Sequence, residues 1–207
     1  MPLTSVGANG ANISNLNRLD TTMTTHTDGG RRGLPWRLIG WGAVVLILLL
    51  PLVTGADWTL FDYIVAGALL GGAGLVLELV VRASGSLAYR AGAGLAVAAA
   101  FLLVWVNGAV GFLGNEDNPA NLMFAGVIAI AVLGSVIAGF KANGMAWAMF
   151  AAAAAQASVG VIALTLGWSS PGNAGLYEVV MGTSVFGTMW LLSGGLFRKA
   201  ADDSSRA

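Results

Sequence analysis

The sequence predicts an all-α polytopic membrane protein, with six transmembrane helices paired as three antiparallel hairpins and both termini cytoplasmic. The first observation is composition: 57% of the 207 residues are hydrophobic and 10% are charged, whereas soluble domains carry about 25% charged residues. The second is a series of six apolar runs, each close to the length of a membrane span. The third is that every lysine and arginine falls on one side of the membrane when these runs are threaded in order.

Three regions follow from composition along the chain. Residues 1–33 are rich in Thr, Asn, Ser and Gly and show no apolar periodicity, so they cannot bury enough surface to offset the entropy lost on ordering. We predict a disordered polar tail over 1–33, a six-helix membrane domain over 34–199 and a second disordered tail over 200–207. Met23, inside the first tail, is a candidate alternative start.

The apolar runs cover residues 38–54, 59–81, 91–114, 122–140, 145–167 and 177–197. Each approaches the roughly 20 residues that a helix needs to cross a bilayer core of about 30 Å. Short connections make consecutive helices antiparallel neighbours. For the first run the alternative is a cleavable signal peptide, with Thr54-Gly55-Ala56 as its cleavage site. The long run and the polar tail before it favour retention, and cleavage would leave five spans in the same orientation.

Ten basic residues set the orientation. They precede the first run, flank the connections between the second and third and between the fourth and fifth runs, and follow the last run. In chain order they are Arg18, Arg31, Arg32, Arg37, Arg82, Arg90, Lys141, Arg198, Lys199 and Arg206. Because cytoplasmic loops carry an excess of lysine and arginine, this pattern predicts that both termini lie inside.

Five acidic residues lie at the opposite ends of the predicted helices: Asp57, Asp62, Glu116, Asp117 and Glu178. The second, fourth and sixth helices begin on that side, where the positive end of the helix dipole favours negative charge. The spacing from Thr59 to Asp62 is that of a capping box. Asn118-Pro119 has the pattern of an N-cap followed by proline at the first helical position. Helix capping is therefore the preferred explanation, and a cation-binding rim is the alternative.

Glu116 and Asp117 are the strongest ion-binding candidates within this acidic set. They are adjacent in an Asn-Glu-Asp-Asn-Pro loop that supplies several oxygens. Two carboxylates are few for a calcium site, and the sequence identifies no metal site beyond this weak pair.

Small residues mark surfaces where helices approach closely. Gly67 and Gly71 form a GxxxG motif, followed by Gly72. In lipid, such residues let backbones come together and gain dispersion contact. We expect packing within the chain, with contact to a second copy or another subunit as the alternative. The predicted partners are accordingly the lipid bilayer and either a homo-oligomer or other membrane subunits.

Three polar residues of the predicted spans are not readily explained by a position at the membrane interface. Glu78 precedes Arg82 by one helical turn, in the favourable order for an i,i+4 ion pair. Asn107 lies seven residues before the end of its run, and Gln156 lies in the middle of the fifth run. We expect Gln156 to hydrogen-bond a neighbouring helix, as buried amides in membranes do. The alternative is that Gln156, Asn107, Asp62 and Glu178 line a path or a ligand site.

The chain lacks the residues of the common catalytic centres. It has no cysteine, and its one histidine, His26, lies in the polar tail. The serines of the spans therefore have no histidine base beside them. The formal net charge of zero argues against nucleic-acid binding, which requires a basic face. We predict neither a cofactor nor an enzyme activity.

Two segments, Trp58 to Tyr63 and Glu78 to Arg82, resemble a pattern found in small multi-span inner-membrane proteins of bacteria. The resemblance implies a bacterial inner-membrane location and carries no activity or binding residue.

Together these observations predict a non-enzymatic structural or accessory subunit of a membrane assembly. The alternative function is a small transporter or channel that uses Gln156, Asn107 and the outer carboxylates, and a third is a regulator of envelope stress.

Overall fold

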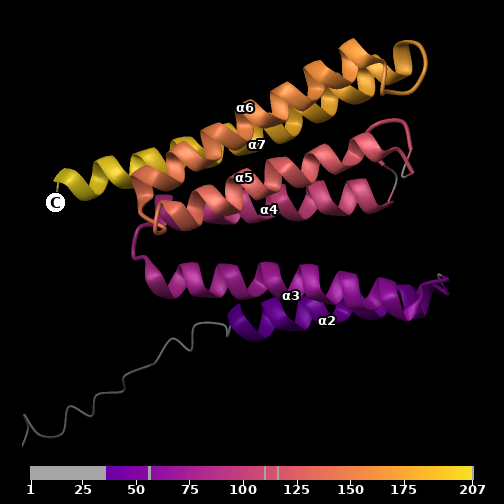
Figure 1. The fold of residues 1–207 in the computed structure, drawn as a ribbon. Helices are drawn as coiled ribbons and strands as arrows, with labels where there is room; N and C mark the ends of the chain where they lie inside the picture. The colour runs from indigo at the N-terminus through magenta and orange to yellow at the C-terminus, as the bar shows by residue number, and fades with distance from the viewer. Residues whose placement is uncertain (1–35, 56, 110, 116, 207) are drawn as a thin grey trace, which may run out of the picture. The chain divides into compact units, whose positions relative to one another are not determined.

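A computed structural model describes residues 36–55, 57–109, 111–115 and 117–206, with side chains from residue 38 onward. This part of the chain is helical and contains no strand. Its elements are α2 (Trp36–Thr54), α3 (Leu60–Ala83), α4 (Leu87–Ala109), the short 3-10 helix η1 (Pro119–Leu122), α5 (Met123–Ile137), α6 (Ala142–Leu166) and α7 (Asn173–Arg206) (Figure 1). The chain divides into two units, Met1–Ile39 and Gly40–Ala207, and the packing described below is that of the second.

Five of these helices are long and apolar enough to cross a membrane: α3, α4, η1 with α5, α6 and α7. The apolar part of α2, Leu38–Thr54, is a shorter helix of the same character. This confirms the predicted all-helical class and a multi-pass membrane protein.

Helix boundaries follow from local sequence signals. Thr59 and Asp62 form the predicted capping box at the start of α3, with each side chain bonded to the other residue's backbone. Asn118 caps η1 through a bond from the Ala120 amide, and Pro119 occupies the first position, as predicted. Gly167 ends α6 in the left-handed conformation, with φ of 66°, which glycine adopts without steric cost. Capping thus explains where three of the predicted spans begin or end.

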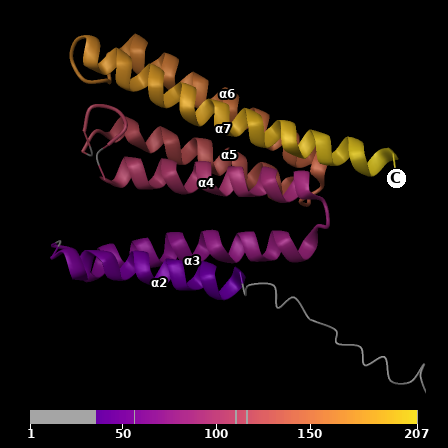
Figure 2. The same ribbon diagram turned by 180° about the vertical axis from the view of Figure 1, so that it is seen from behind.

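The four helices α4 to α7 form the main core. The most extensive contacts join α6 with α7, followed by α4 with α7 and α5 with α6 (Figures 1 and 2). The Ser193 hydroxyl of α7 donates to the Gly92 carbonyl of α4 at 2.8 Å. A side chain on Gly92 would meet Leu196 and Phe197 at 3.3 Å, so the small residue allows this close crossing.

The hairpin prediction needs one refinement. Helices α4 and α5 are consecutive in the chain, but their mutual contact is small, and α4 packs chiefly on α7. The buried face of α4 carries Gly92, Ala99 and Leu103. Gly92 on this face meets Ser193 and Phe197 of α7. The tightest neighbours of α4 are therefore set by small-residue contacts rather than by chain order.

Two predicted boundaries are wrong. The third apolar run was expected to be helical through residue 114, but α4 ends at Ala109 and Phe112 follows it in a loop. The disordered tail expected over 200–207 is instead helical through Arg206. Ala200 of α7 is buried. Adding residues to an existing helix also costs far less free energy than starting a new one.

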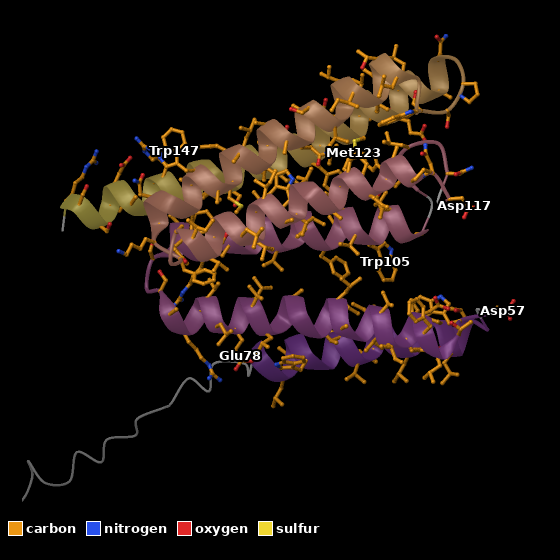
Figure 3. The ribbon with its side chains drawn as sticks, viewed as in Figure 1. Asp57, Glu78, Trp105, Asp117, Met123 and Trp147 are labelled. Carbon is orange, nitrogen blue, oxygen red and sulfur yellow. The ribbon has the colours of Figure 1, made fainter. Side chains whose placement is uncertain are left out.

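The alternation of the helices separates the charges of the Gly40–Ala207 unit into two ends. One end, which we call the acidic end, carries Asp57, Asp62, Asp117 and Glu178, near the connections before α3, η1 and α7. The basic end carries Arg82, Arg90, Lys141, Arg198, Lys199 and Arg206, at the connections before α4 and α6 and along the last turns of α7, together with the acidic Glu78, Asp202 and Asp203. Figure 3 shows Asp57 and Asp117 at one end and Glu78 toward the other.

Candidate functional site

The loop after α4 folds back into the bundle at the acidic end. Phe112 is 7% exposed and Leu113 is fully buried. The side-chain oxygen of Asn121, Oδ1, accepts hydrogen bonds from the backbone N–H groups of Phe112 and Leu113, at 3.1 and 2.8 Å. The Asn118 amide donates to the carbonyls of Leu113 and Trp168, both at 2.9 Å. Two asparagine side chains therefore hold an irregular loop in a fixed position.

The Phe112 ring occupies a notch left by a glycine on α7. A side chain on Gly182 would overlap this ring, so only glycine admits it. The ring also makes edge-to-face contacts with Phe124 and Phe186, at centroid distances of 4.8 and 5.7 Å. Phe112 thus links the loop to α5 and α7. Phe112 could not be identified from the sequence, because its apolar neighbours make it resemble an ordinary residue of a membrane span.

Several buried polar atoms have no hydrogen-bond partner among the described residues. They belong to α4, α6 and α7, and are Asn107 Oδ1, Gln156 Oε1 and Nε2, Glu178 Oε2, Thr183 Oγ1 and Trp190 Nε1. Gln156 is 0% exposed. Leaving a buried polar group unpaired costs about 1–3 kcal/mol, so this concentration is unusual for a close-packed interior.

Two of these groups lie within about one helical turn of each other. A side chain on Gly160 would come within 2.5 Å of Thr183 Oγ1, which places that hydroxyl directly against α6. Gln156 lies four residues before Gly160, about 6 Å along the helix and further from the acidic end. We call Gln156 and Thr183 the internal polar pair. The prediction that Gln156 hydrogen-bonds a neighbouring helix is wrong for the described residues.

Phe112 lies between the internal polar pair and the acidic end. Its ring sits at Gly182, the residue before Thr183. Glu178 lies four residues before Gly182, about 6 Å nearer the acidic end. The order along α7 is therefore Glu178, the Phe112 ring, and then Thr183 with Gln156 beyond it.

Asn107 and Glu178 occupy positions different from those expected. Asn107 is two residues from the end of α4, about 3 Å along the axis rather than 10 Å, because the helix ends early. Its amide donates to the Leu103 carbonyl at 2.7 Å, while its own oxygen is unpaired. Glu178 was expected at a helix N-terminus, but α7 begins at Asn173 and places it in the second turn.

Glu78 forms the predicted i,i+4 ion pair with Arg82. It is 8% exposed and also accepts a hydrogen bond from the Trp41 indole at 3.4 Å. The Trp41 ring packs against Gly74, one turn along the same face of α3. Glu78 therefore joins α2 to α3 near the basic end.

The remaining acidic candidates do not converge. Asp62 accepts bonds at 2.7 Å from both the backbone N–H and the hydroxyl of Thr59, so it serves as a cap. Asp117 is exposed, and Glu116 lies outside the described residues. Within the described part of the chain, no three His, Cys, Asp or Glu side chains are grouped so as to hold a metal ion.

An apolar groove of about 460 Å³ runs between α4 and α5 and is bordered by α3. Small residues form much of its wall, including Ala68, Gly72, Ala96, Ala100 and Ala131. A second hollow, of about 700 Å³, lies at the basic end beside Lys199 and Asp203. Gln156 lines neither of them.

No protein-family model matches the chain, and no curated protein or solved structure matches it at a significant level. The arrangement itself provides an asparagine-held loop, a buried aromatic residue and, behind it, polar groups without partners.

Proposed function

We propose that this protein is a non-enzymatic subunit of a membrane assembly in the bacterial inner membrane, where it binds a second copy or another membrane subunit through α3. The observation that carries the proposal is a difference between two sets of glycines. Side chains added at Gly134, Gly160 and Gly194 would meet Ala148, Thr183 and Phe150 at 2.5–2.8 Å. These glycines serve packing within the chain.

Three glycines of α3, Gly67, Gly71 and Gly72, do not serve packing within the described chain, whereas Gly74 meets the Trp41 ring of α2 at 3.6 Å. Side chains added at Gly67, Gly71 and Gly72 would meet no atom of the described residues within 4 Å. The apolar stretch of α3 is also the least buried among the five spans, at 6% compared with 39% for α6. Small residues at i and i+4 allow a partner helix to approach closely in lipid. An available GxxxG on an exposed span supports contact with another polypeptide.

The distribution of charge supports the orientation. Six basic residues of the described chain lie at the basic end, and the acidic residues of the connections lie at the other. Because the excess of lysine and arginine marks the cytoplasmic side, we place the basic end and both termini in the cytoplasm.

Chemical crosslinking in native membranes, followed by purification in mild detergent, tests the assembly. We expect crosslinked species in the wild-type chain and their loss in Gly67→Leu/Gly71→Leu, because the larger side chains separate the helix backbones. Gly126→Leu is the control, since Gly126 is another helical glycine with open space around it and lies on the exposed face of α5. A monomer that yields no crosslinked partner would contradict the proposal.

A second candidate function is a small transporter or channel. The observation that favours it is the internal polar pair, together with the unpaired oxygens of Asn107 and Glu178 nearer the acidic end. Flux of protons or monovalent cations into proteoliposomes should fall to background in Gln156→Leu. The matched control is Ser158→Leu on the exposed face of α6. Equal flux in wild type and Gln156→Leu would remove this candidate.

A further inference from the structure

We propose that Gln156 and Thr183 form an internal water-binding site, which is entered from the acidic end when the Phe112 ring leaves its notch. The proposal rests on the second candidate function and specifies the ligand and the regulation of that path.

The unpaired groups identify the ligand. Gln156 presents one acceptor and two donors, and Thr183 adds a hydroxyl that donates and accepts. Water complements both kinds of group, and a buried water typically makes about three hydrogen bonds to such atoms. The pair is enclosed, since Gln156 is 0% exposed, which favours the smallest polar ligand. A metal cation is disfavoured because the carboxylate of Glu178 belongs to a residue five positions before Thr183, about 7.5 Å along α7.

The packing indicates the way in. Toward the basic end, Trp190, Ser193 and Phe197 of α7 are all 0% exposed, and Ser193 is bonded to α4. Toward the acidic end, the Phe112 ring at Gly182 lies next to Thr183. Phe112 belongs to a loop, whereas the barriers on the other side belong to long helices. The obstacle that moves most readily is therefore Phe112.

The loop is fixed by side-chain hydrogen bonds rather than by a helical ladder, so its displacement does not require a helix to unfold. The Gly111 N–H still bonds to the Asn107 carbonyl, but residues 112–115 do not continue the helix, and side-chain bonds from Asn118 and Asn121 hold Phe112 and Leu113 in place. The ring makes no polar contact and fills a notch without a side chain opposite it. Opening requires a few loop bonds to exchange for water, while α4 to α7 remain packed.

The chain contains a single glutamine, so selective labelling of glutamine side chains with nitrogen-15 reports on Gln156 alone. The full chain in lipid nanodiscs should show magnetisation transfer from water to this NH₂ group. Exchange of its protons with deuterated solvent should be about tenfold faster in Phe112→Leu, equivalent to an opening free energy lower by about 1.4 kcal/mol. Phe197→Leu is the matched control, because Phe197 is also a buried aromatic residue and lies on the basic side.

The outcomes separate the proposals. Absence of transfer from water, or equal acceleration by Phe197→Leu and Phe112→Leu, would overturn the water site or its entry route. If Phe112→Leu does not fold, Gly182→Ala replaces it, because the added methyl displaces the same ring. Water transfer to Gln156 without any flux through proteoliposomes would retain the site and remove the transport function.

Discussion

Gly160 shows how one missing side chain positions a functional group. It lies where the Thr183 hydroxyl meets α6, and a methyl there would contact Oγ1 at 2.5 Å and Cγ2 at 3.0 Å. The hydroxyl is thereby brought into the interior without a partner of its own. The close contact between Gly160 and Thr183 therefore does more than improve packing. It also places the Thr183 hydroxyl about one helical turn from Gln156.

Gly160→Ala should lower the free energy of unfolding by about 1–3 kcal/mol, because the added methyl forces Thr183 or α7 to shift. Removing the hydroxyl and methyl in Gly160→Ala/Thr183→Ala should recover part of this loss, which a double-mutant cycle measures. The measurement is denaturant titration in mixed micelles. Gly126→Ala, at an open helical position, is the control and should change stability little. Equal losses in the single and double variants would show that Thr183 is not the group displaced.

The loop between α4 and η1 shows how a short element depends on two side chains. Its backbone N–H groups at Phe112 and Leu113 have no helical partner and bond to Asn121 instead. Buried backbone groups are almost always paired, so an asparagine is needed where the helix ends early. This element also determines where Phe112 lies, and with it the access that we propose to the internal polar pair.

Asn121→Ala should release the loop, because it leaves two N–H groups unpaired at about 1–3 kcal/mol each. Backbone amide exchange at Phe112 and Leu113 should become at least about tenfold faster, while exchange within α6 stays unchanged. Asn115→Ala is the control, since Asn115 contributes its backbone carbonyl rather than its side chain to the loop. Unchanged exchange at Phe112 in Asn121→Ala would show that other contacts hold the loop.

At the scale of the whole Gly40–Ala207 unit, the described basic residues are confined to one end, and the other end carries acidic residues alone. Basic residues lie near the connections before α4 and α6 and along the last turns of α7, and acidic residues lie near the connections before α3, η1 and α7. This pattern serves two purposes at once. It favours one threading direction through the membrane, and it places acidic side chains such as Asp62 where the helix dipole is positive.

The chain has no cysteine, which makes the orientation directly measurable with single introduced thiols. Asn115→Cys, in the loop before η1, should react with a membrane-impermeant maleimide in intact cells. Asn143→Cys, in the first turn of α6, should react only after the membrane is permeabilised. The expected order follows from placing the basic end in the cytoplasm. The reverse labelling pattern would invert the orientation and leave the fold unchanged.

The helical class, the approximate spans, the capping of α3 and η1, and the Glu78–Arg82 pair can all be predicted from the sequence. These features depend on residues within about one turn of each other or on the hydrophobicity of one segment, and both are readable along the chain. The end of α4 escaped prediction because its apolar run continues into Phe112 and Leu113, which are buried by tertiary contacts rather than by a helix.

Which glycines pack within the chain, and which polar atoms lack partners, depends on contacts between distant segments. Gly160 and Gly71 are both glycines within apolar spans, but Thr183 from α7 meets Gly160 and no described atom meets Gly71. Gln156 likewise carries an amide that could hydrogen-bond to a neighbouring helix, yet none of the described helices presents a partner to it. Contacts between distant segments depend on register and crossing, and neither is encoded in the periodicity of a single span.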